Sequence, residues 1–246
     1  MRAFLEKGAA VGRYTVESHV GDTARFRIKD GVGEELVVRQ ASEEDMKAIF
    51  ALIKSAQITG REISQRILGR EGLGRSIGEG GLFSDYTGRK EQRMKEFRML
   101  LGTPYLLVAV KEGDVVGFIA GFPEDKIAEL KKEEGISDWK KHVHWHEKPN
   151  DTKKYVLGDP LVVAKGYRHR GVGEPLVRAL LHNCAKAGME EFHAEVVSEP
   201  IENTAPLRLL ERLGFKETGR EEMTMKTLGV DEPVKFTARV FTIKTS

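Results

Sequence analysis

The chain has 246 residues, of which 40% are hydrophobic and 32% are charged, and its formal net charge is +2. This composition is typical of a globular protein with one large domain or two small ones, and it excludes a disordered chain. The balanced charge gives no overall field that would attract nucleic acid, so the basic clusters at 89–98 and at Lys140 and Lys141 leave nucleic-acid binding as a minor alternative.

The single cysteine, Cys184, excludes a disulfide within the chain and favours a reducing compartment. It shares helical spacing with Leu176 and Leu180, so we expect a core residue rather than a nucleophile. No stretch is apolar for long enough to span a membrane, and the first residues have no sustained apolar region of the kind that a secretory signal needs. The expected location is the cytoplasm.

The predicted elements alternate between antiparallel strand pairs and helices, which indicates a mixed α/β (α+β) fold. The first part of the chain predicts a hairpin at 14–28 that turns at Gly21-Asp22, a strand at 35–41, a helix at 42–57 capped by Ser42, an irregular glycine-rich stretch at 60–88, a basic helix at 89–101 and a hairpin at 105–122. After an insertion at 123–153, the pattern predicts a strand at 155–163, a helix at 172–187, a strand at 190–197, a short helix at 203–215 and closing strands at 215–227 and 234–245.

The stretch YRHRGVG at 167–173 lies between a predicted strand and a predicted helix. Amides at a helix start have no intrahelical partner, Gly171 and Gly173 let the backbone approach a ligand, and Arg168 and Arg170 add charge-assisted donors. These features predict a cradle for a pyrophosphate, with a tight turn carrying solvated arginines as the alternative. A dinucleotide fingerprint would need glycine at position 176, which is Leu176, and the P-loop lysine is absent.

Four segments in order resemble the GNAT superfamily of acyl-CoA-dependent N-acetyltransferases. LVVAKGYRHRGVGEPLV at 161–177 is similar to its central strand, Arg-x-x-Gly-x-Gly loop and helix, and NTAPLRLLERLGFKETG at 203–219 is similar to its last helix. LVVRQASEEDMKAIFAL and LLVAVKEGDVVGFIAGF resemble its first strand and helix and its next two strands. The resemblance implies a central, mostly antiparallel twisted sheet with a splayed parallel strand pair and helices on both faces. We expect an N-terminal extension at 1–34 and one GNAT-like domain at 35–246.

The resemblance also implies a cofactor, acetyl-CoA, with coenzyme A as the product. The pyrophosphate would lie on the loop at 168–174, and the pantetheine amides would pair with the strand at 161–163. Asn203 would lie near the thiol end of the cofactor, unless it serves only as a helix N-cap. The implied cofactor-binding residues are Leu161, Val162, Val163, Arg168, His169, Arg170, Gly171, Val172, Gly173, Glu174 and Asn203.

The catalytic residues follow the family pattern less closely. Asp159 stands where the family often has a glutamate base, and its alternative role is to cap a turn before Pro160. The tyrosine acid of many members is replaced by Leu210, so the acid would be water or His193, unless the thiolate leaves unassisted. The N–H of Val163 would stabilise the oxyanion.

We therefore expect an N-acetyltransferase that moves an acetyl group from acetyl-CoA to a primary amine of a small molecule or a protein by direct attack on the thioester. The alternative is a non-catalytic acyl-CoA-binding module, and the oligomeric state, including a homodimer, stays open. The HVHWH stretch at 142–146 is expected to be a solvated loop, with acceptor lining and zinc binding as alternatives, and the glycine-rich run at 69–81 a lid.

Overall fold

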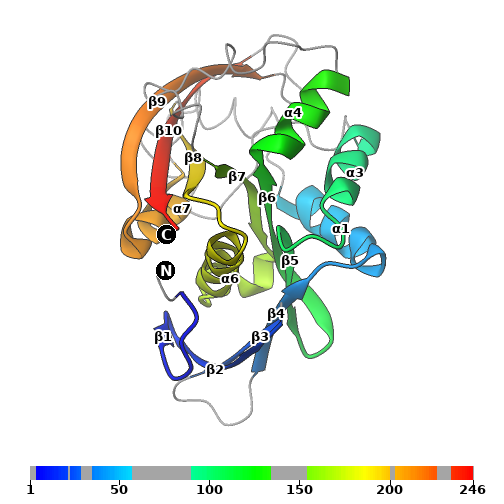
Figure 1. Cartoon of the computed structure of the whole chain (residues 1–246), viewed down its shortest axis with the longest axis vertical. Helices are drawn as coiled ribbons and strands as arrows, with labels where there is room; N and C mark the ends of the chain where they lie inside the picture. Colours follow the sequence, from blue (N-terminus) through cyan, green and yellow to red (C-terminus); the bar gives the residue numbers. More distant parts are fainter. Residues whose placement is uncertain are drawn as a thin grey trace, which may run out of the picture.

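A computed structural model describes residues 4–21, 23–28, 35–56, 90–133, 154–199, 203–225 and 234–245. The strands in these ranges form one sheet in the order β1-β2-β3-β4-β5-β6-β7-β8-β10-β9 (Figure 1). The strands are β1 Ala10–Val11, β2 Tyr14–Val20, β3 Thr23–Ile28, β4 Glu35–Gln40, β5 Leu106–Lys111, β6 Asp114–Pro123, β7 Tyr155–Val163, β8 Glu191–Glu199, β9 Lys216–Met225 and β10 Val234–Lys244. Neighbouring strands pair antiparallel except β7 and β8, which are parallel.

Helices cover both faces of this sheet, as expected (Figure 1). The described α-helices are α1 Met46–Ala56, α3 Lys90–Met99, α4 Glu124–Glu133, α6 Gly173–Lys186 and α7 Thr204–Leu213. On one face, a Cβ at Gly117 would lie 3.3 Å from Leu176 of α6. On the other face, the Phe97 ring of α3 meets the Phe118 ring of β6 edge to face, with centroids 5.8 Å apart. Because the side chains of a strand alternate, β6 serves both layers at once. The predicted fold class is confirmed.

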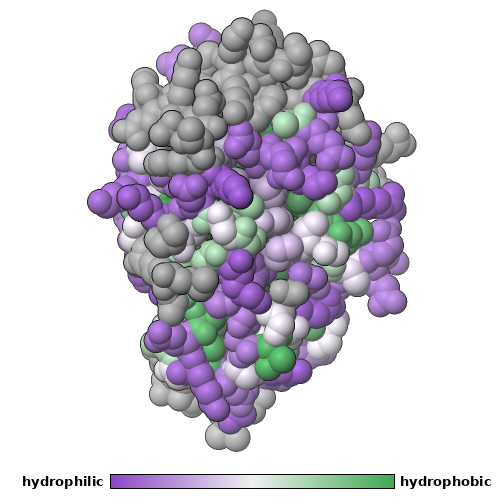
Figure 2. Space-filling model, viewed as in Figure 1, coloured by the Kyte–Doolittle hydropathy of each residue, from purple (hydrophilic) through white to green (hydrophobic). Residues whose placement is uncertain are grey.

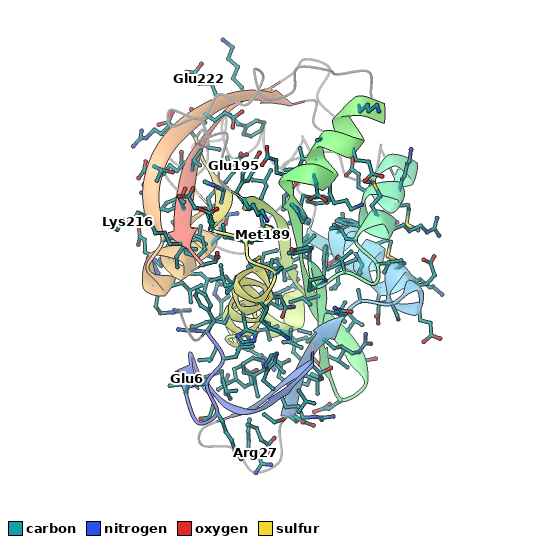
Figure 3. All side chains as sticks on the ribbon, in the orientation of Figure 1. Glu6, Arg27, Met189, Glu195, Lys216 and Glu222 are labelled. Atoms are coloured by element: carbon teal, nitrogen blue, oxygen red, sulfur yellow. The ribbon has the colours of Figure 1, made fainter. Side chains whose placement is uncertain are left out.

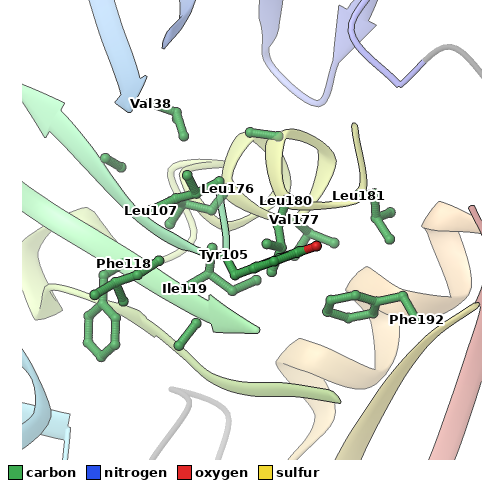
Figure 4. Packing of buried hydrophobic residues seen from close by; sticks show 14 of the residues in the cluster. Val38, Tyr105, Leu107, Phe118, Ile119, Leu176, Val177, Leu180, Leu181 and Phe192 are labelled. Carbon is green, nitrogen blue, oxygen red and sulfur yellow. The ribbon is translucent and has the colours of Figure 1, made fainter. Parts of the chain in front are cut away.

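Helix α6 packs on one face of the sheet, where it contacts β4, β5, β6 and β7. Its buried residues include Leu176, Val177, Leu180 and Leu181 (Figure 4), and a Cβ at Gly121 of β6 would lie 3.2 Å from Leu180. Cys184 belongs to the same buried face, and burial raises the pKa of its thiol. The expectation that Cys184 is a core residue is confirmed. This face holds α6 in place, and the start of α6 carries the glycine loop.

The N-terminal residues extend the same sheet. β2 and β3 form the expected hairpin, with Val20 opposite Thr23, and β3 pairs with β4. Val11, Tyr14 and Val16 are buried in the main core, so this hairpin is packed against the domain. In Figure 1, β1 and β2 pass beside the end of α6.

A 3-10 segment at Glu43–Asp45 leads directly into α1 and shows why the chain turns into a helix there. Ser42 donates its backbone N–H and its hydroxyl to the carboxylate of Asp45, at 2.8 and 3.0 Å, and Arg39 adds two hydrogen bonds to the same carboxylate. Burial raises the pKa of Asp45, but the hydrogen bonds from Arg39 and Ser42 outweigh it and leave the pKa below its usual value. The helix start predicted at Ser42 is confirmed.

Polar side chains dominate the described surface on the face shown in Figure 2, with apolar side chains in small patches. Among the described residues, no helix is both long and apolar enough to cross a bilayer. The glycine-rich stretch at 60–88 lies outside the described residues, as does HVHWH at 142–146. Of the expected insertion at 123–153, the structure describes α4.

Candidate active site

The site begins with a fork between β7 and β8. The two strands pair only between residues 155–158 of β7 and 191–194 of β8. Beyond that point, β7 continues beside β6 to Val163, and β8 continues beside β10 to Glu199. The facing backbone edges past Gly158 therefore have no ladder partner in the part of the chain that is described, and such groups require one.

The backbone of β7 directs hydrogen-bonding groups into this fork. The N–H of Ala164 donates to Val116 O at 2.9 Å, which means that it points toward β6. Successive amides of a strand point to opposite sides, so the N–H groups of Val163 and Leu161 point away from β6 and toward the fork. The carbonyl of Val163 points the same way and accepts a hydrogen bond from Arg168 Nε at 3.0 Å.

The glycine loop lies between β7 and α6 and presents further amides. His169 and Gly171 both have left-handed backbone angles, with φ of 58° and 83°. Among the described residues, the amides of Gly171 and Val172 donate to no backbone carbonyl. The amides of Gly173 and Glu174 occupy the first turn of α6, where no intrahelical acceptor exists, and Pro175 follows without an N–H. Four consecutive amides, those of residues 171–174, therefore lack a backbone acceptor in the part of the chain that the structure describes.

Basic side chains surround this loop. Arg170 and Lys111 approach the ring of Tyr167 with their charged groups 6.0 and 5.8 Å from its centroid. His169 and Arg170 are exposed, while Arg168 is partly buried and turned toward Val163. The loop thus combines free amides with positive charge, which is the arrangement that binds phosphate groups.

The side chain of Glu174 does not face the loop. Only 3% of it is exposed, and it forms ion pairs with Arg178 of α6 at 3.0 Å and Arg212 of α7 at 2.9 Å. Only the amide of Glu174 is available to a ligand. Its carboxylate instead joins α6 to α7, a link that the sequence did not reveal because Arg212 is 38 residues away.

Two further residues line the space between β7 and α7. A Cβ at Gly173 would lie 3.7 Å from Leu161 and 3.5 Å from Leu209, so this side of Gly173 faces the fork. Asn203 occupies the N-cap position of α7 but makes no side-chain capping bond. Its Oδ1 is buried without a hydrogen-bond partner among the described residues. A buried acceptor of this kind calls for a donor, and the amide of a ligand would supply one.

The proposed acid and base lie at the narrow end of the fork. Asp159 follows Gly158, the last residue of β7 that pairs with β8, and His193 pairs with Leu157. His193 is 5% exposed, and its Nδ1 lies 2.9 Å from Thr242 Oγ1. Its Nε2 lies 3.4 Å from Glu191 Oε2. The sequence predicted His193 as a candidate acid but did not predict its neighbours Thr242 and Glu191. The alternation of β8 could have indicated Glu191, because it places this residue on the same face as His193.

The remaining catalytic expectation concerned Leu210. This residue, which stands where many acetyltransferases of this type have a tyrosine, is 5% exposed and belongs to the hydrophobic core. It has no proton to donate, so α7 contributes packing at this position.

A mixed sheet with a forked parallel pair, followed by an amide-rich loop and a helix, defines the acetyltransferase class of enzymes. Residues 80–215 match the acetyltransferase (GNAT) family, so the chain belongs to this family and is an N-acetyltransferase. Members of this family use acetyl-CoA as the acetyl donor. A comparison of the sequence with curated proteins finds no match.

Solved structures share the fold. A protein from Salmonella typhimurium, yncA, determined with its cofactor acetyl-CoA, has a TM-score of 0.51 and 20% identity over 86% of this chain and 94% of its own. A protein from Acinetobacter baylyi ADP1 assigned as an acetyltransferase has a TM-score of 0.53 and 14% identity over 87% of this chain and 94% of its own. An agmatine N-acetyltransferase has a TM-score of 0.51 and 14% identity over 85% of this chain and 99% of its own.

Proposed function

We propose that the chain transfers an acetyl group from acetyl-CoA to a primary amine of a small molecule or a protein, by direct attack of the amine on the thioester. The observation that carries this proposal is the set of amides that have no backbone acceptor among the described residues, on the open edge of β7 and in the loop before α6. The edge of β7 suits the amides of pantetheine, and the loop suits a pyrophosphate. These two chemistries occur together in coenzyme A.

Within this proposal, the cofactor enters along β7. Its pyrophosphate accepts hydrogen bonds from the amides of residues 171–174, and Arg170 adds charge. The pantetheine extends the sheet as a substitute strand beside residues 161–163. The orphaned Oδ1 of Asn203 accepts a hydrogen bond from the ligand, which supports the cofactor role over a simple N-cap. The thioester then lies near the narrow end of the fork, beside Asp159.

The reaction needs a neutral amine, a stabilised oxyanion and a protonated leaving thiolate. Asp159, acting directly or through a water molecule, takes the proton from the ammonium. The nitrogen then forms a bond to the thioester carbon, and the carbon–sulfur bond breaks when the tetrahedral intermediate collapses. The N–H of Leu161 is nearer the narrow end than that of Val163, which supports Leu161 as the oxyanion donor. His193 or solvent protonates the thiolate, and the nitrogen of the intermediate releases its second proton to solvent, which leaves a neutral amide.

A thiol-release assay tests the proposal. Purified protein is mixed with acetyl-CoA and a panel of primary amines that includes agmatine, spermidine and peptides with free N-termini, and free coenzyme A is measured with a thiol reagent. We expect release that depends on one class of amine and falls at least 100-fold in Asp159→Asn, because a missing general base costs about that much. Binding of acetyl-CoA without release for any amine would favour the non-catalytic module, and absence of binding would refute both.

A further inference from the structure

The turn between β1 and β2, directly before the N-terminal hairpin, reaches the glycine loop that precedes α6. A Cβ at Gly171 would lie 3.0 Å from Arg13 Cγ, 3.2 Å from Arg13 Cδ and 3.5 Å from Tyr14. A Cβ at Gly12 would lie 3.1 Å from Glu174 Oε2. The turn between β1 and β2 is therefore in van der Waals contact with the loop that precedes α6.

Further contacts with the core and with α6 fix the position of this turn. Tyr14 and Val16 are buried in the main core, and further along the hairpin the ring of His19 meets that of His182 on α6, with centroids 4.3 Å apart. The hairpin thus packs against α6 near both ends of the helix. Arg13 is not carried on an independent arm, and the position of its backbone beside Gly171 is fixed by the core.

The side chain of Arg13 is suited to a ligand rather than to the fold. Arg13 is exposed, and it takes part in no hydrogen bond or ion pair within the described ranges, whereas Arg25 and Arg27 of β3 pair with Glu35 and Glu17. Its aliphatic stem lies over Gly171, and the guanidinium begins one bond beyond Cδ. Glu174, whose carboxylate lies beside Gly12 of this turn, already pairs with Arg178 and Arg212.

We propose that Arg13 is a ligand of the cofactor pyrophosphate, supplied to the site by the N-terminal extension. This inference rests on the proposed function, because it requires a coenzyme A pyrophosphate on the amides of the loop. Arg13 would then add a charge-assisted hydrogen bond to the phosphate oxygens from beside Gly171. The extension is accordingly a part of the donor site, and it favours donors that carry a diphosphate.

Three ligands that differ in their phosphate groups show which phosphate Arg13 contacts. Coenzyme A, dephospho-coenzyme A without the 3′-phosphate, and pantetheine without any phosphate are titrated into the full chain by calorimetry or, for pantetheine, by thermal shift at millimolar concentration. The variants are Arg13→Gln and, as the matched control, Arg27→Gln. Arg27 lies on β3 of the same N-terminal extension and points away from α6 (Figure 3). We expect Arg13→Gln to weaken coenzyme A and dephospho-coenzyme A alike by about tenfold, to leave pantetheine unchanged and to flatten the salt dependence of binding, with no effect in Arg27→Gln.

The other outcomes contradict the inference in different ways. Equal weakening of all three ligands means that Arg13 only shapes the loop. Weakening of coenzyme A but not of dephospho-coenzyme A assigns Arg13 to the 3′-phosphate and overturns the pyrophosphate contact. Unchanged affinity for every ligand overturns the inference alone. Failure of the wild-type chain to bind coenzyme A overturns the proposed function and this inference with it.

Discussion

Gly158 of β7 faces the ring of Phe192 of β8 at the point where the two strands separate. A Cβ at position 158 would lie 2.8 Å from Phe192 Cε1 and closer still to Cζ. The ring cannot easily move, because it is 2% exposed and packs edge to face against Phe215 of the chain segment after α7. The absence of a side chain at 158 therefore allows the last paired position of the fork to close.

Gly158→Ala is expected to destabilise the protein by about 1–3 kcal/mol, because the added methyl overpacks a buried site. Urea denaturation measures the change. Gly166→Ala is the control, since a Cβ at Gly166 meets no atom within 4 Å and its φ is not left-handed. If both variants unfold at the wild-type urea concentration, the tight contact at the fork does not limit what position 158 accepts.

Gly173→Glu tests the position of the cofactor. A carboxylate there would face the fork beside Leu161 and repel a pyrophosphate, while the φ angle of Gly173 is ordinary and an acidic residue at a helix start is favourable. We expect at least a 100-fold loss of acetyl-CoA affinity with a melting temperature close to that of the wild type. Gly173→Ala, which adds the Cβ without the charge, is the control and should lose much less. Intact affinity in Gly173→Glu would place the cofactor elsewhere.

The buried carboxylate of Glu174 predicts a stability effect that is separate from binding. Glu174→Gln removes the charge shared by Arg178 and Arg212, and both arginines retain some access to water. We expect a loss of about 1–3 kcal/mol in unfolding free energy. Arg220→Gln, which breaks an exposed pair with Glu217, is the comparison and should cost less than about 0.5 kcal/mol. Equal losses in thermal denaturation would contradict a special role for the link between α6 and α7.

Local signals account for what the sequence predicted well. The hairpin of β5 and β6 turns at Glu112 and Gly113, both with left-handed angles, and such a turn between alternating apolar strands is readable from the chain. The position of α6 followed from its periodicity. The contacts of Glu174 with Arg212 and of Gly171 with Arg13 join residues far apart in the chain, and no local pattern encodes them. The loop could therefore be predicted, but its N-terminal neighbour could not.

The pair of histidines between the hairpin and α6 predicts how stability depends on pH. Burial lowers the pKa of His182, and the charges of His19 and Lys186 lower it further. The folded state therefore favours the neutral imidazole more than the unfolded state does, so the unfolded state binds more protons as the pH falls through 6.5, the ordinary value for histidine. The contribution of His182 to stability should accordingly be complete above that pH and decrease below it.

Urea denaturation at pH 7.5, 6.5 and 5.5 would measure the loss of stability, and His182→Gln should reduce this loss. His19→Gln, which removes only the neighbouring charge, should have a smaller effect in the same direction. A His182→Gln variant whose stability falls with acid as steeply as that of the wild type would show that other groups control the acid limit of the fold.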